Sequence, residues 1–318
     1  MADDGGSMLR YHRHLADNNN LTEAETSVRH FVILFLIVAM CASLYACTKR
    51  VKKDPRQLTA LVSIEGSDTM TALVKAWATN FMKNEPDVPI SVNSGDSGGG
   101  IDALLNRTTD LAAASRDLNA SESIQLHAKS IKLKKITVAR DSVAIIVNPA
   151  NPVESLTLEQ LKNIFSGSIK NWSAVGGNKA PIEVFSREDK SGTYNFFKEH
   201  LLQGAEYAKG SQTVLSGNEL LAAVEKNKKA IGYLGMGTAS TAGKKIRVIG
   251  LKLSANSAPV KPTELSTVTD YPLSRPLILF MDEDPKPSVR KFVDYCLGSE
   301  AQKLVREAGY APVEQKLN

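Results

Sequence analysis

Residues 58–81 read LTALVSIEGSDTMTALVKAWATNF, and this stretch decides the fold class. The apolar run from Leu58 to Ile64 predicts a short strand, and the polar segment Gly66-Ser67-Asp68-Thr69 follows it. Apolar residues then recur at helical spacing, which predicts an amphipathic helix whose inner face holds Met70, Leu73, Val74, Trp77 and Phe81. A strand, a Gly/Ser loop and a helix in this order are typical of an α/β protein.

The same unit recurs twice along the chain. A strand at Ile90–Val92 precedes Gly95-Asp96-Ser97-Gly98-Gly99-Gly100, and Ile101, Leu104 and Leu105 mark the next helix. A strand at Ile182–Phe185 precedes Ser191-Gly192-Thr193, and Tyr194, Phe197 and Leu201 mark the third helix. The alternation predicts a mostly parallel sheet flanked by helices. Further strands are expected at 110–115, 143–147, 230–235 and 276–280, and further helices at 156–165, 289–296 and 301–308.

The three Gly/Ser segments suggest a site for a small anion. A helix N-terminus leaves backbone N–H groups unpaired and carries a partial positive charge. In α/β sheets, ligands bind outside the carboxyl ends of the strands, where these segments lie. Arg187 lies four residues before Ser191 and offers a fixed fork of donors to a tetrahedral oxyanion, with Asp189 placed to hold that fork. We therefore expect a protein that captures an oxyanion rather than transforms it.

Other kinds of chemistry find little support in the chain. Gly95–Gly99 reads like the segment around a trypsin-type nucleophile, but the histidines of the globular part, His127 and His200, both follow Ser97, whereas that class places its base earlier. The sequence contains neither a phosphate-binding P-loop motif nor metal-ligand spacing, so we expect no cofactor and no metal. A net charge of +5 and only 6% aromatic residues argue against nucleic-acid binding.

The N-terminal part predicts export and a membrane tether. Residues 31–40 read FVILFLIVAM, and the apolar run to Ala46 is shorter than the ~20 residues that span a bilayer. Leu44-Tyr45-Ala46-Cys47 resembles a bacterial lipobox, so we expect a lipoprotein-type signal in residues 1–47, lipidation at Cys47 and a tether at 48–58. An uncleaved signal anchor is the alternative. Residues 1–30 make a long leading segment, which leaves open a true start at Met8 or further downstream.

From about Leu58 to the C-terminus, the chain resembles the substrate-binding proteins of phosphate ABC importers, the PstS-type family. The markers that carry the resemblance occur in the family's order, and so many together are specific. They are the segments 66–70, 97–101, 114–116, 187–193, 230–233, 271–277 and 309–312.

The resemblance implies a type II periplasmic-binding-protein fold. Two α/β lobes, each with a mostly parallel sheet, would be joined by two hinge strands and close on one phosphate. Lobe 1 would comprise residues 59–140 and 236–318, and lobe 2 residues 141–235. The crossings would fall near 139–141 and 233–237. The protein would not be an enzyme; we expect a monomer that delivers phosphate to a permease and its ATPase.

The resemblance also implies the ligand-binding residues. Arg187, Ser191, Gly192 and Thr193 would bind the anion from the second lobe. The residues expected to bind it from the first lobe are Asp68, Thr69, Asp96, Ser97 and Ser115.

One departure from the family pattern concerns selectivity. Some family members have an aspartate where this chain has Ser115, and it accepts the proton of hydrogen phosphate, which sulfate lacks. We hypothesise that Asp68 or Asp96 takes over this role.

Two alternatives for the function stay open. One is an oxyanion-binding surface sensor or adhesin without a transport role. The other, less favoured, is a secreted hydrolase. All the alternatives for the N-terminal segment place the bulk of the chain outside the cytoplasmic membrane and tethered to it, in the periplasm or on the extracellular face.

Overall fold

A computed structural model of the chain describes residues 61–263 and 271–313. These described residues belong to one compact unit. The expected signal segment, Cys47 and the tether lie outside the described residues. None of the helices in the described ranges has the length and apolar character needed to cross a bilayer.

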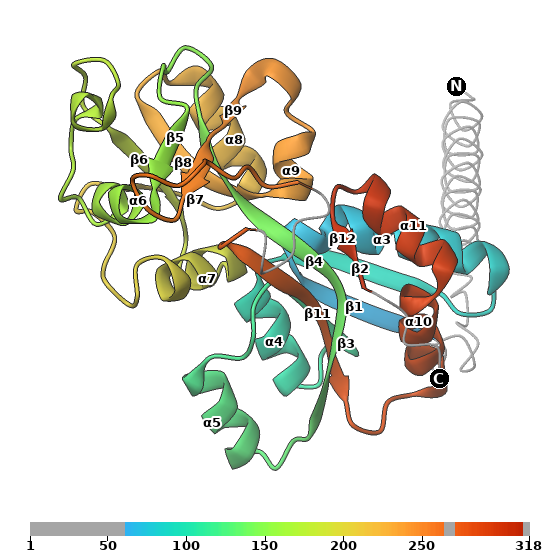
Figure 1. Cartoon of the computed structure of the whole chain (residues 1–318). Coiled ribbons are helices and arrows are strands. Elements are labelled where there is room, and N and C mark those ends of the chain that lie inside the picture. Colours follow the sequence, from blue (N-terminus) through green and yellow to red (C-terminus); the bar gives the residue numbers. More distant parts are fainter. Residues whose placement is uncertain (1–60, 264–270, 314–318) are drawn as a thin grey trace, which may run out of the picture. The chain divides into compact units, whose positions relative to one another are not determined.

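The centre of the fold is a ten-stranded sheet (Figure 1). Eight strands lie side by side in the order β2, β1, β3, β11, β4, β8, β6 and β7, and β9 and β12 pair with β4. A separate pair joins β5 to β10 in parallel. The bounds are β1 Val62–Ser67, β2 Ile90–Gly95, β3 Leu111–Ala114, β4 Leu133–Val147, β5 Ser155–Thr157, β6 Glu183–Arg187, β7 Gln212–Val214, β8 Ala230–Gly235, β9 Arg247–Val248, β10 Gly250–Lys252, β11 Ser274–Asp282 and β12 Ala311–Pro312.

The expected mostly parallel sheet is wrong for the middle of the molecule. β1 is parallel to β2 and β3, and β6 is parallel to β7 and β8. However, β11 runs antiparallel to β3 and β4, and β4 runs antiparallel to β8. The sheet is therefore mixed. The fifteen-residue strand β4 begins ten residues before the expected Val143. The sequence did not predict its first half, because that half mixes lysines with apolar residues and has no continuous apolar run.

The helices follow the expected alternation. Their bounds are α3 Asp68–Asn84, α4 Ser97–Leu105, α5 Ala120–Ala128, α6 Leu158–Phe165, α7 Gly192–His200, α8 Gly217–Lys226, α9 Met236–Ser240, α10 Pro287–Leu297 and α11 Ser299–Glu307, with single 3₁₀ turns at Trp172–Val175 and Gly243–Lys245. The helix expected from Leu156 begins two residues later, because Thr157 and Gln160 form a reciprocal capping box at its start. In α7, Phe196 is buried instead of the expected Tyr194, which is half-buried.

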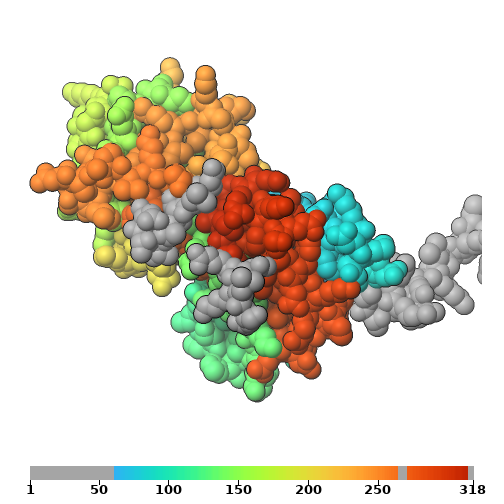
Figure 2. Space-filling view, turned by 45° about the vertical axis from the view of Figure 1, so that its right-hand side comes forward, coloured from blue at the N-terminus to red at the C-terminus, as the bar shows by residue number. Residues whose placement is uncertain are grey.

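The buried apolar side chains form two pairs of clusters. The first two clusters, here called the first group or half, contain Trp77. In this group α3, α10, α11 and α4 pack around β1, β3 and β11. Figures 1 and 2 show the red C-terminal helices beside α3. The other two clusters, here called the second group or half, contain Trp172. In this group α6, α7 and α8 pack around β6, β8 and the end of β4. Both tryptophans are buried, as expected for Trp77.

Strand β4 belongs to both halves of this core. Val138 and Ala139 pack in the first group, whereas Val143 and Ile145 pack in the second. The second group also takes up side chains between Ala239 and Leu273. The expected lobe boundary at residue 236 therefore does not coincide with this division of the core.

The glycines of residues 98–100 lie inside α4, not in a loop ahead of it. Asp96 is the N-cap, and its Oδ1 accepts the N–H of Gly99 over 2.7 Å. A Cβ on Gly100 would lie 2.6 Å from the carbonyl oxygen of Glu65. Gly100 thus lets the helix pack directly on β1, so packing within the fold accounts for it without a ligand.

Candidate functional site

The start of α3 is tied to the end of β6 by an ion pair whose guanidinium is buried and whose carboxylate is half-buried. Arg187 Nη1 donates to Asp68 Oδ2 over 2.9 Å, and the arginine side chain is 2% exposed. The same carboxylate oxygen accepts the N–H of Gly217, at the start of α8, over 2.9 Å. Asp68 therefore faces both a guanidinium and a helix N-terminus, two groups that stabilise a negative charge.

Asp68, and not the expected Asp189, holds the guanidinium of Arg187. Asp189 is exposed, whereas Arg187 Nη2 donates to the carbonyl oxygen of Leu215 over 2.7 Å. These bonds use two of the five N–H groups that a guanidinium carries, and Nε is buried without a partner among the described residues. Arg187 thus retains donors for a further acceptor.

A second buried ion pair lies beside the first helix. On neighbouring strands, Arg275 of β11 is paired in register with Asp141 of β4. Its Nε and Nη2 donate to Asp141 Oδ2 over 3.0 and 2.8 Å, and both side chains are fully buried. Burial raises the pKa of Asp141, and the charge of Arg275 opposes that shift.

Arg275 also contacts the first turns of α3 and α7. Nη1 donates to the hydroxyl of Thr193 over 2.9 Å, and Nη2 donates to that of Thr69 over 3.4 Å. The two threonine hydroxyls are themselves 3.4 Å apart. Two of the expected site residues are thereby brought together by a residue that was not expected.

The start of α4 meets the start of α7 directly. Ser97 Oγ accepts the N–H of Ser115 over 3.1 Å, and both serines are fully buried. A Cβ on Gly192 would lie 2.2 Å from Ser97 Oγ and 2.4 Å from Ser115 Oγ. The carbonyl oxygen of Lys190 accepts the N–H of Gly98 over 3.2 Å. Glycine is therefore required at position 192 for this close approach.

Two expected site residues act as helix caps. Ser191 Oγ accepts the N–H of Tyr194 at the start of α7 over 3.4 Å. Asp96 caps α4, as described above, and none of its hydrogen bonds in the described residues reaches another expected site residue. The hypothesis that Asp96 receives a ligand proton therefore gains no support from its contacts, whereas Asp68 belongs to the cluster around Arg187.

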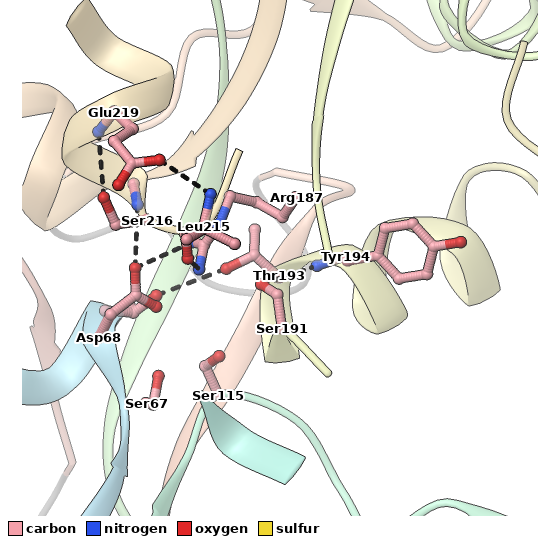
Figure 3. Close-up of polar contacts among 12 residues, drawn as sticks. Ser67, Asp68, Ser115, Arg187, Ser191, Thr193, Tyr194, Leu215, Ser216 and Glu219 are labelled. Atoms are coloured by element: carbon pink, nitrogen blue, oxygen red, sulfur yellow. Dashed lines mark hydrogen bonds and ion pairs between the residues drawn. The ribbon is translucent and has the colours of Figure 1, made fainter. Parts of the chain in front are cut away.

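The three helix N-termini converge, as the sequence predicts. Figure 3 shows Asp68 and Ser115 grouped with Arg187, Ser191 and Thr193, which come from three elements (α3, β6 and α7), the loop after β3 and the loop before α7. Hydroxyl groups, N–H groups of helix starts and one buried guanidinium are the donors that recognise a small oxyanion. Within the described ranges, no cluster of His, Cys, Asp and Glu is suited to hold a metal ion.

The sequence reasoning missed Arg275, Asp141 and Gly217. The segment 271–277 was among the family markers, but nothing in its local pattern points to a role for its arginine. The signal that could have found the pair is a charge inside each of two apolar strands, because a buried charge needs a partner.

Comparison with known proteins agrees with the resemblance. Residues 50–300 match the PBP superfamily domain. The "Phosphate-binding protein PstS" of Staphylococcus saprophyticus is 30% identical over 292 residues, which cover 89% of this chain and 90% of that protein. The chain belongs to the PstS family. Another relative, "Protein SphX" of Synechococcus elongatus, is 28% identical over 93% of this chain and 89% of its own.

Solved structures give the same result for the fold. A putative phosphate ABC transporter substrate-binding protein from Clostridium perfringens, solved with bound phosphate, superposes with a TM-score of 0.71 at 31% identity, over 80% of this chain and 100% of that one. An ABC-type phosphate transport receptor from Vibrio cholerae gives a TM-score of 0.65 at 29% identity, over 79% and 100%. The family consists of binding proteins, which confirms that the chain is not an enzyme.

Proposed function

We propose that this chain is an extracytoplasmic binding protein that captures inorganic phosphate and delivers it to the permease and ATPase of an ABC importer. The observation that carries the proposal is that the starts of α3 and α4 both meet the start of α7, and that Asp68 at the start of α3 holds the buried Arg187. The family relatives are named as phosphate-binding proteins or as receptors of phosphate transporters, which supports the same ligand.

The proposed ligand-binding residues are those expected from the sequence. Arg187, Gly192 and the hydroxyls of Ser191 and Thr193 would act from one side. From the other side would act Thr69, Ser97 and Ser115, together with the carboxylates of Asp68 and Asp96. The oxygens of a tetrahedral oxyanion accept hydrogen bonds, so hydroxyls and a guanidinium can bind it as donors. A carboxylate can only accept, so it binds the anion where the anion carries a proton to donate.

Two lobes that close on the ligand fit the division of the core. We place one hinge strand at 139–141, within β4, and the return crossing near residue 273, where the side chains return to the first core group. This replaces the crossing expected at 233–237, because the side chains from Ala239 to Leu273 pack in the second group. Ligand binding would close the lobes by a hinge motion. The protein would act as a monomer on the outer face of the cytoplasmic membrane, tethered through a lipid on Cys47 or through an uncleaved anchor.

Titration calorimetry tests the ligand. The full-length protein, kept in mild detergent and freed of bound ligand by unfolding and refolding, is titrated with phosphate and with sulfate at neutral pH. We expect one phosphate bound per chain and sulfate at least about tenfold weaker, since a lost charge-assisted hydrogen bond costs about 1.5–3 kcal/mol. Binding of neither anion contradicts the proposal. Phosphate binding without an importer encoded nearby favours the sensor or adhesin alternative.

Asparagine variants test which carboxylate reads the ligand proton. In Asp68→Asn we expect the preference for phosphate over sulfate to fall about tenfold or more, because the anionic acceptor is lost. Asp96→Asn is measured beside it. Asparagine caps a helix as well as aspartate does, so a fall in the preference of this variant would assign the proton-accepting role to Asp96 instead. The hypothesis is wrong for Asp68 if its variant keeps the wild-type preference in the same titrations.

A further inference from the structure

The guanidinium of Arg275 is completely enclosed, and most of its donors are used. Its four hydrogen bonds go to Asp141 Oδ2, which accepts two, and to the hydroxyls of Thr193 and Thr69. The aromatic ring of Phe196 lies 5.8 Å from the guanidinium carbon. The second carboxylate oxygen of Asp141 accepts the N–H of Met236 over 2.9 Å, so the pair is held by β4, β11 and the start of α9.

Stability alone gives a weak reason for this arrangement. A buried ion pair loses hydration on both groups, and apolar side chains of similar volume are often as stable or more stable. The fold also makes room for the pair, since a Cβ on Gly235 would lie 2.6 Å from Asp141 Oδ2. A role in orienting neighbouring groups explains why the charged pair of Arg275 and Asp141 occupies this buried position.

The bonding to the threonines fixes where their hydroxyl protons point. A guanidinium only donates hydrogen bonds, whereas a threonine hydroxyl has one proton to donate and two lone pairs to accept with. Both oxygens accept from Arg275, so neither proton points toward it. The two oxygens are 3.4 Å apart, and at most one proton serves that contact. At least one proton is left over, and no acceptor for it lies among the described residues.

We propose that Arg275, held by Asp141, is a positioning residue that turns the hydroxyls of Thr69 and Thr193 into hydrogen-bond donors for the oxyanion ligand. The inference deepens the proposed function and rests on it. Arg275 lies beneath the two threonines and acts through them, without touching the ligand. Arg275 joins β11 to the first turns of α3 and α7, and these two helices belong to different halves of the core. The two threonine hydroxyls are therefore aligned when the halves are in contact.

A double-mutant cycle on the full chain tests the proposal, with inorganic phosphate as the probe. We expect Arg275→Lys, which keeps the charge but not the planar fork, to lower phosphate affinity about tenfold in the wild-type background. In a Thr193→Val background, the loss of phosphate affinity caused by Arg275→Lys should be at least about threefold smaller, because one of the oriented hydroxyls is already absent. Thr193→Ser keeps the hydroxyl and should restore the full effect of Arg275→Lys.

Controls separate this role from loss of structure and from failure of the proposed function. Arg247→Lys is the matched control, because Arg247 donates to the carbonyl oxygen of Val153 and contacts no threonine; it should leave affinity within about twofold. If Arg275→Lys does not fold, Asp141→Asn replaces it in the cycle. Equal losses in the wild-type and Thr193→Val backgrounds overturn the inference, whereas a wild-type protein that binds no phosphate overturns the proposed function instead.

Discussion

Replacing Arg187 with glutamine is expected to weaken phosphate binding about 100- to 1000-fold. The change removes the one buried guanidinium that both faces the proposed ligand and neutralises Asp68. The carboxylate would then repel the incoming anion, and truncating one partner of a hydrogen-bonded charge pair in a binding interface costs about 2–5 kcal/mol of binding free energy, of which we expect about 3–4 kcal/mol here. Each 1.4 kcal/mol corresponds to about tenfold in affinity. Titration calorimetry with phosphate measures the loss.

Two further variants define what the loss means. Arg187→Lys keeps the charge without the fork and should fall between the wild type and Arg187→Gln. Arg107→Gln is the control, because the side chain of Arg107 is 74% exposed and lies 3.8 Å from Asp282, and its effect should stay within about twofold. An Arg187→Gln variant that binds phosphate within about tenfold of wild type would show that the anion is held elsewhere.

Sequence periodicity predicted the elements of this fold because the periodicity is local. Met70, Leu73 and Trp77 share one face of α3, and all three are buried. The expected Gly/Ser segments do lie at helix starts, and these starts do meet. Their position could be predicted because a parallel strand followed by a helix brings each such turn to the same edge of a sheet.

Long-range pairing could not be predicted in the same way. The partner of Arg187 lies 119 residues away, at Asp68, whereas the pattern pointed to the nearby Asp189. The ion pair of Arg275 and Asp141 spans 134 residues and exists only because β11 and β4 are antiparallel neighbours. A sequence gives no register for such strands unless a short turn joins them.

The role of the glycines also depended on tertiary packing. In the sequence, Gly98, Gly99 and Gly100 look alike, and all three lie in a segment that suggested an anion site. In the structure, a Cβ on Gly100 would meet the backbone of β1 at 2.6 Å, whereas one on Gly99 would meet nothing nearer than Asp96 at 3.5 Å. Glycine is therefore required at position 100 by packing but not at position 99, and only the neighbouring backbone in the folded structure reveals this difference.

Substituting Gly192 with alanine is expected to weaken phosphate binding about 10- to 100-fold while changing thermal stability little. The added Cβ would lie 2.2 Å from Ser97 Oγ and 2.4 Å from Ser115 Oγ, and the site cannot close over that overlap. The clash is between α7 and the α4–β3 region, which belong to different halves of the core. The halves relieve it by staying apart, so neither loses its own packing. Titration calorimetry and thermal unfolding together measure both effects.

Two other glycines in a helix start make this expectation specific. Gly99→Ala adds a Cβ with ordinary contacts and should keep both affinity and stability, or raise stability by about 1 kcal/mol through helix propensity. Gly100→Ala places its Cβ against the backbone of β1 within one half, so it should lower the unfolding temperature instead. If Gly192→Ala behaves like Gly100→Ala, losing stability in proportion to affinity, the contact at Ser97 and Ser115 belongs to a single rigid core. If it loses affinity alone, the contact forms when the two halves close, which is the behaviour that capture and release of a ligand require.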